Sequence, residues 1–168
     1  MGQINLTTEQ LQEFINNYHV YPYYDITGGV YQEPFALANT YYPIKAPLVD
    51  GDLYGFTLNG DPEYNIEFTG DYPVYVEFRG VSDIGITAGT DVDITFSLFK
   101  DSGSGYEIQD KFKSTVTVSK NGDKQSIQTV GEILLNKGDK LQVHGQATSA
   151  TTLEIVNLKL GIKTIHLA

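Results

Sequence analysis

The sequence contains no cysteine, no tryptophan and only one methionine among its 168 residues. Without cysteine, a disulfide framework and thiolate metal sites are excluded. A chain of this length buries roughly two-thirds of its unfolded surface on folding, so it does not need such cross-links. No apolar run approaches the roughly 20 residues of a membrane-spanning helix. These absences predict one ordinary globular domain, or one domain with an additional arm.

Positive charge is also scarce. The 11 lysines and arginines face 21 aspartates and glutamates, which gives a formal net charge of −10 at pH 7. Such a chain repels the phosphate backbone of nucleic acids and the surface of anionic membranes. We therefore expect no nucleic-acid partner and no membrane insertion. The first ten residues contain no basic residue and no apolar core, so we also expect no Sec-type signal peptide there.

Aromatic residues, by contrast, are plentiful, with twelve tyrosines and eight phenylalanines. They favour strands and contact surfaces. From residue 53 onwards, short runs alternate between apolar and polar residues, which is the period of a strand with one buried face. The clearest runs cover residues 54–58, 64–68, 74–78, 92–98, 112–118 and 141–143. Their near-regular spacing, with no helical pattern between them, predicts an antiparallel sandwich or barrel.

The C-terminal run over residues 152–167 departs from simple alternation. Its phase slips at Val156-Asn157 and again near Lys163-Thr164. A slip of one residue would turn the apolar side chains outward unless a β-bulge absorbs it. We therefore expect either one long strand with bulges or two strands that meet at a tight bend.

The N-terminal residues predict a short amphipathic helix. Thr7 is a suitable N-cap, and Gln10 three residues later completes a capping box. One apolar face then follows at helical spacing, formed by Leu11, Phe14, Ile15 and Tyr18. Because so short a helix is marginally stable alone, this face is expected to dock, either on its own domain or on a partner or sister chain.

Residues 18–50 carry seven tyrosines and four of the six prolines. Proline removes a backbone donor, so this stretch is unlike a central strand and is expected to form an extended aromatic arm. Tyr21, Tyr23 and Tyr24 are candidates for contact with a protein partner or a carbohydrate, because tyrosine offers a flat apolar body with a polar tip. The alternative is that they pack the arm onto the domain. The predicted division is therefore a helix and attachment arm at residues 1–52 and a β domain at residues 53–168.

Residues with catalytic or metal-binding chemistry are present but form no recognisable motif. The histidines, His19, His144 and His166, lack the close spacing of a metal-binding pair. His144 follows Val143 in an alternating run, so we expect it to face away from the core as a solvated or interface residue. No nucleophile elbow or nucleotide-binding loop is present. We expect no enzymatic activity, no cofactor and no catalytic residues.

Carboxylates gather in the predicted turns. Asp91 and Asp93 are expected on one solvent-exposed strand face, opposite Val92 and Ile94. Most turn aspartates are expected to bond to their own backbone, and a structural calcium ion stays an alternative. The Asp-Ser-Gly-Ser-Gly stretch at residues 101–105 is expected to be a flexible loop.

Three consecutive motifs near the C-terminus carry a family pattern. Ile133-Leu134-Leu135 precedes Lys137-Gly138-Asp139-Lys140-Leu141-Gln142-Val143, and the last strands run from Leu153 to Leu167. A strand, a Lys-Gly-Asp type of turn and a further strand before a closing strand resemble a tumour-necrosis-factor-like or complement-globular-head jelly roll. The resemblance covers residues 60–168. The closing strand here is aliphatic, whereas that of the family is usually rich in aromatic residues.

The resemblance implies an antiparallel jelly-roll sandwich of about eight strands that assembles as a homo-oligomer, with a closed trimer favoured. Such heads recur on viral and phage fibres and decoration proteins. A non-enzymatic virion component is therefore expected: a capsid decoration, head fibre or baseplate-type protein whose arm contacts a capsid or other virion protein. The alternative is a carbohydrate-binding β-sandwich module for a host surface glycan. Outside a virion, the chain would be a soluble extracellular or cytoplasmic protein.

Overall fold

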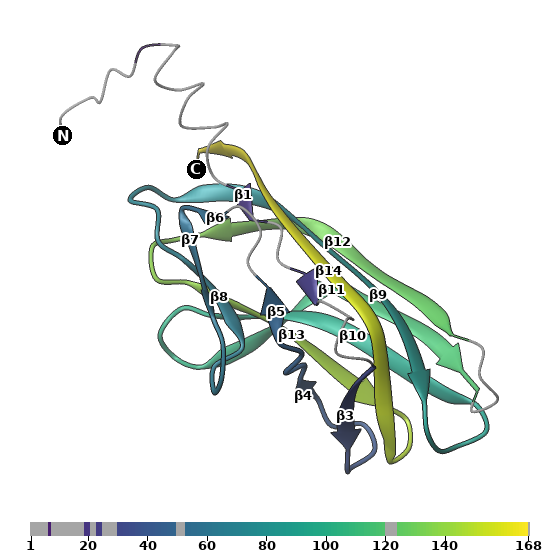
Figure 1. Ribbon diagram of the computed structural model, residues 1–168. Coiled ribbons are helices and arrows are strands. Elements are labelled where there is room, and N and C mark those ends of the chain that lie inside the picture. Colours follow the sequence, from purple (N-terminus) through teal and green to yellow (C-terminus); the bar gives the residue numbers. More distant parts are fainter. Residues whose placement is uncertain are drawn as a thin grey trace.

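The computed structural model describes residues 7, 19–20, 23–24, 30–49, 53–119 and 124–167. These residues form two antiparallel sheets packed face to face, which confirms the predicted all-β sandwich (Figure 1). The short strands are β1 (His19–Val20), β2 (Tyr23–Tyr24), β3 (Tyr31–Phe35), β4 (Tyr42–Pro43), β5 (Leu48–Val49), β6 (Leu53–Tyr54), β7 (Phe56–Asn59) and β8 (Asn65–Phe68). The long strands are β9 (Val74–Ile86), β10 (Val92–Asp101), β11 (Tyr106–Val118), β12 (Gln125–Leu135), β13 (Lys140–Ala147) and β14 (Thr151–Leu167). The predicted N-terminal helix lies outside the described residues.

The chain crosses several times between the two sheets. One sheet has the order β12-β9-β14-β1-β6, with β2 and β3 also paired to β14 and β5 paired to β2. The other has the order β11-β10-β13-β8-β7, with β4 paired to β13. Because neighbouring strands in space are distant in sequence, as with β9 and β14, the sandwich is closed by long-range pairing.

β14 is the longest strand and runs beside β9 through most of the molecule (Figure 1). Its register shifts between Ile155 and Asn157 and between Thr164 and His166. Of the two predicted alternatives, one long strand with bulges is confirmed, and two strands that meet at a bend are excluded. Asn157 stabilises the first bulge, since its backbone carbonyl accepts a 2.6 Å hydrogen bond from the Ser82 hydroxyl and its side chain bonds to Asp83. The inward row of apolar side chains continues on both sides of the bulge.

The core lies between the sheets and takes one side of each strand. In β9, alternate residues from Val74 to Ile84 are buried, and the residues between them are exposed or half-buried. Burying one valine, isoleucine or phenylalanine side chain stabilises the fold by roughly 2 kcal/mol. The largest fully buried side chains are Phe35, Phe68, Phe78, Phe112, Ile84, Ile94, Leu98, Ile127, Leu135, Leu141, Leu153 and Ile155.

Residues 31–47 of the predicted arm pack onto this same core. β3 pairs with β14 and with no other described strand, a position where the missing donor of Pro34 costs little. Phe35 and Ile44 are buried, and the ring of Tyr42 stacks on Phe35 with centroids 5.5 Å apart. In this part of the arm, the aromatic residues therefore cover their own domain. The domain boundary at residue 52 stays a prediction.

The surroundings of Gly145 in β13 show how closely residues 31–47 pack against that strand. A Cβ at Gly145 would lie 2.7 Å from Cζ of Phe35, 3.1 Å from Phe96 and 3.2 Å from Ile44, all three of which are buried. We expect Gly145→Ala to lower the free energy of unfolding by about 2 kcal/mol through overpacking, measured by urea denaturation. Gly60→Ala is the matched control, because no atom lies within 4 Å of the place that its added methyl group would take. An equal loss in both variants would contradict this docking.

Candidate functional site

The end of the sandwich where β10 turns into β11 is organised by one aspartate. Asp101 Oδ1 accepts hydrogen bonds from the backbone NH groups of Gly103 and Gly105, at 2.7 and 2.9 Å. Both glycines have positive φ angles, of 101° and 103°, a region that favours glycine. The stretch is a loop, as predicted, and its aspartate bonds to its own backbone, as the turn interpretation expects.

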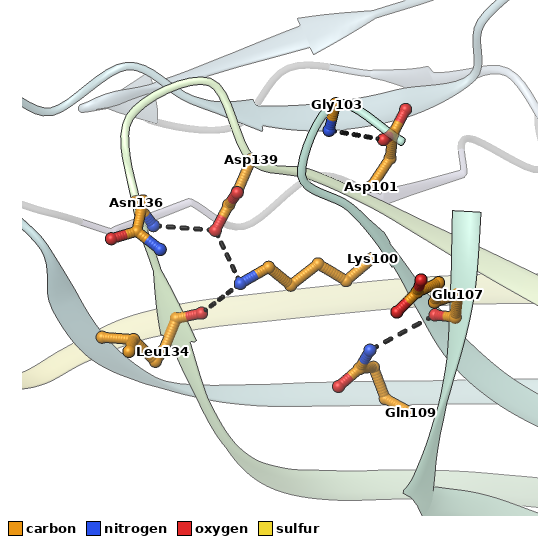
Figure 2. Close-up of polar contacts among 8 residues, drawn as sticks. All are labelled: Lys100, Asp101, Gly103, Glu107, Gln109, Leu134, Asn136 and Asp139. Carbon is orange, nitrogen blue, oxygen red and sulfur yellow. Dashed lines mark hydrogen bonds and ion pairs between the residues drawn. The ribbon is translucent and has the colours of Figure 1, made fainter. Parts of the chain in front are cut away.

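Lys100 crosses the same end of the sandwich. Its ammonium donates to the Leu134 carbonyl of β12 at 2.8 Å and lies 2.6 Å from Asp139 Oδ2, with both charged side chains largely buried (Figure 2). The carboxylate of Asp139 also accepts a 2.8 Å bond from the Asn136 backbone NH. Burial alone would raise the pKa of Asp139, but Asn136, Lys100 and Ser102 together bring this pKa below its ordinary value. The charge pair thus ties β10 to the β12–β13 turn.

A small polar cavity adjoins this pair. Its volume is about 210 Å³, and its lining residues are Lys100, Ser102, Ser104, Gly105, Glu107 and Gln109. Glu107 and Gln109 reach the same side as Lys100 because the pairing of β10 with β11 shifts register: Phe96 lies opposite Ser114, but Leu98 lies opposite Gln109. Directly paired residues share a face, so the bulge turns both polar side chains of β11 toward Lys100.

The expectation of a solvated His144 is wrong, and an interface role for this residue stays a prediction. His144 is 8% exposed although it lies on the outer face of its sheet. Its ring stacks on Phe99 with centroids 3.9 Å apart, and the ring of Tyr106 lies 5.9 Å away. Tyr41 contacts Phe99 edge-on. Residues from other parts of the chain therefore cover a face that alternation alone assigns to solvent.

The tautomer of His144 follows from its neighbours. Gln142 Nε2 donates to the Glu63 carbonyl at 2.7 Å, so its Oε1 faces His144 Nε2, also at 2.7 Å, and must accept. Nε2 therefore carries the proton, and Nδ1 is buried with no hydrogen-bond partner among the described residues. Burial lowers the pKa of His144 to about 4, so the ring is neutral near pH 7.

The other predicted site residues fall into two groups, those outside the described residues and those in strand β2. Leu11, Phe14, Ile15, Tyr18 and Tyr21 lie outside the described residues. Tyr23 and Tyr24 form β2, where Tyr23 pairs with Lys159 of β14 and both tyrosines pair with β5. Their roles as assembly or ligand contacts stay predictions.

Asp91 and Asp93 are exposed, as expected, and accept hydrogen bonds from the hydroxyls of Ser119 and Thr117. The described part of the chain holds no cluster of three or more His, Asp or Glu side chains that could bind a metal ion. It also contains no helix with the length and hydrophobicity of a membrane-spanning segment.

The sequence predicted Ser102, Ser104 and Gly105 only as part of a loop, and it did not single out Lys100, Glu107 or Gln109. One signal was available: Lys100 continues the inward phase of Ile94, Phe96 and Leu98, and a lysine in that phase requires a buried partner. Glu107 and Gln109 gave no such signal, because the bulge in β11 reverses their phase relative to Phe112.

No family model and no curated sequence matches this chain. Solved structures do match its fold. Eiger TNF from S. frugiperda aligns with a TM-score of 0.67 at 11% identity, over 91% of this chain and 95% of that one. This chain has the jelly-roll fold of TNF-like and complement globular-head domains. The resemblance stated from the C-terminal motifs is confirmed.

Two further structures support the same fold. Murine APRIL at pH 5.0 aligns with a TM-score of 0.54 at 12% identity, over 86% of this chain and 98% of that one. The globular domain of zebrafish complement 1qA aligns with a TM-score of 0.52 at 14% identity, over 90% and 99%. At these identities, the likeness concerns the fold alone.

The Lys100–Asp139 pair yields a stability prediction. Lys100→Met should lower the free energy of unfolding by about 3 kcal/mol, because it leaves a buried carboxylate without its cation. Since the folded-state pKa of Asp139 lies below the ordinary 3.8, its contribution is present above that pH and is lost as pH falls through the folded value. Lys137→Met is the control, because the Lys137–Asp71 pair is exposed. Equal urea midpoints for the two variants would refute a structural role for the buried pair.

His144 yields a pH prediction. The unfolded state takes up a proton below about pH 6.5, whereas the folded ring stays neutral down to about pH 4. Stability is therefore complete above pH 6.5 and falls as pH decreases toward 4, by roughly 3 kcal/mol in total from this residue. NMR titration of the ring Cε1–H resonance should give a pKa near 4. His144→Phe should flatten the stability profile between about pH 6.5 and 5, while His19→Gln and His166→Gln should leave it steep. A His144 pKa near 6.5 would contradict this burial.

Proposed function

We propose that this chain is a non-enzymatic assembly and interaction module, built as a β head that is displayed by an N-terminal attachment segment. The observation that carries this proposal is the fold: a jelly roll shared with TNF, APRIL and complement globular-head structures across nearly the whole chain. The proposed assembly is a closed homotrimer. The resemblance to such heads supports it, because a sandwich of this type presents a broad sheet face to a symmetry mate.

The finer proposal is a virion component: a capsid decoration, head fibre or baseplate-type protein that binds a capsid or other virion protein through its arm. The path of the N-terminal segment supports an attachment role. His19 pairs with Lys163 and with Tyr54, so the chain enters the sheet beside β14, close to the C-terminal end of that strand. The first strand that the structure describes thus lies at one end of the head. This geometry suits an anchor whose affinity comes from buried aromatic and aliphatic side chains.

Carbohydrate binding is the second candidate function. The polar cavity between β10 and β11 favours it, because hydroxyl, amide and carboxylate groups converge there.

The assembly proposal is tested by absolute mass. We expect light scattering on the full chain to give a trimer, and Leu11→Asp combined with Phe14→Asp to abolish oligomerisation or partner binding while the β head stays folded. Placing carboxylates on a docked apolar face costs several kcal/mol and should release it. Leu37→Asp is the control, because Leu37 is an exposed apolar residue on a loop of the head.

Point variants are preferred to truncation, since Phe35, Ile44 and Ala46 belong to the core. Unchanged assembly in the double variant would exclude the helix face as the anchor. A monomeric wild-type chain would exclude self-assembly and leave attachment to a different protein as the remaining form of the proposal.

A further inference from the structure

We propose that the polar cavity between β10 and β11 binds a neutral polyhydroxylated ligand, a single sugar ring such as the terminal unit of a glycan. The site is formed by Ser102, Ser104, Glu107 and Gln109, with Lys100 at its base. This inference is independent of the assembly proposed above, because it uses no residue of the N-terminal segment.

The cavity is of a size for one ring. Its volume is about 210 Å³, and it opens to solvent beside the exposed residues Ser102, Ser104 and Glu107. An extended oligosaccharide would have to leave the cavity after its first unit. A monosaccharide, or one end of a longer glycan, is therefore the ligand that its dimensions fit.

The lining groups suit hydroxyls. The Ser104 hydroxyl and the Gln109 amide can each donate and accept, the Ser102 hydroxyl can accept while it donates to Asp139, and the Glu107 carboxylate accepts from two donors at once. Glu107 forms no ion pair with another described residue, and its carboxylate is exposed beside the cavity (Figure 2). A vicinal diol presents two O–H donors at the spacing of a carboxylate, so Glu107 is its expected acceptor.

The local charge argues against an anion. The charged residues that line the cavity are Lys100 and Glu107, and the charge of Lys100 is already neutralised by its 2.6 Å contact with Asp139. A phosphate or an acidic sugar entering the cavity would meet excess negative charge. A neutral ligand avoids this cost and leaves the buried ion pair intact.

The hydrogen bonds around the cavity preorganise its wall for binding. Asp101 holds the amides of Gly103 and Gly105, and the positive φ angles of these glycines fix the shape of the loop. Across the cavity, Lys100 is fixed to Leu134 and Asp139. Because little ordering remains to be done on binding, a small polar ligand can bind measurably. No aromatic ring lines the cavity, so we expect a Kd on the order of 1 mM.

The test is an NMR titration of the ¹⁵N-labelled full chain with glucose, galactose and mannose, and separately with inorganic phosphate. We expect at least one neutral sugar to shift the amides of residues 102–109 saturably. Glu107→Gln and Gln109→Ala should each weaken this binding about tenfold, through loss of a hydrogen bond to the ligand. Glu132→Gln and Gln128→Ala, at exposed positions of β12, are the matched controls and should leave the Kd unchanged.

Three results would overturn the proposal. The first is no saturable shift with any of the three sugars. The second is a shift that maps to Tyr23 and Tyr24, or that survives in Glu107→Gln, which would place carbohydrate binding elsewhere. The third is stronger binding of phosphate than of any sugar, which would make the cavity an anion site. Since these readouts do not depend on oligomeric mass, failure here is distinguishable from failure of the assembly proposal.

Discussion

The pairing of β14 with β9 is the constraint on which the rest of the fold depends. From Leu153 to Leu167 one edge of β14 is held by β9, while β3, β2 and β1 take places along the other edge. A strand this long twists, and its apolar row stays directed at the core because the bulge between Ile155 and Asn157 resets the phase. Of the two unpaired residues at the bulges, Val156 is half-buried and Ile165 is exposed. Without the first bulge, Leu158, Leu160 and Ile162 would face solvent.

The two sheets leave the apolar core uncovered at the ends of the sandwich, and polar side chains cover it at one end. Lys100 sits in the inward phase of β10 where the apolar core ends, so its charge must be neutralised. Asp139, in the turn between β12 and β13, neutralises the charge of Lys100. The Leu134 carbonyl accepts a hydrogen bond from the same ammonium. The polar cavity lies outside this closure. The residues that finish the core therefore also form the base of the candidate ligand site.

The alternation of apolar and polar residues predicted the strands and both bulges of β14, because each of these features depends only on residues that are consecutive in the sequence. It failed where distant segments meet. His144 does face away from Val143, as its phase requires, but Phe99 and Tyr106 of other strands cover it, and the segment at Glu63 fixes its partner Gln142. The cavity was missed for a related reason. The bulge of β11 is defined by its pairing with β10, and the sequence of β11 alone does not show the shift.

The two proposed surfaces use different parts of the sandwich. The N-terminal strands add to the sheet beside β14, whereas the cavity lies between β10 and β11 of the other sheet, where Lys100 bonds to the Leu134 carbonyl of β12. In the first sheet, β12 and β1 lie on opposite sides of the β9–β14 pair. An attachment segment at β1 therefore leaves the cavity uncovered by its own anchoring strands. The two proposed roles require this separation, because the attachment surface must not cover the surface that binds the ligand.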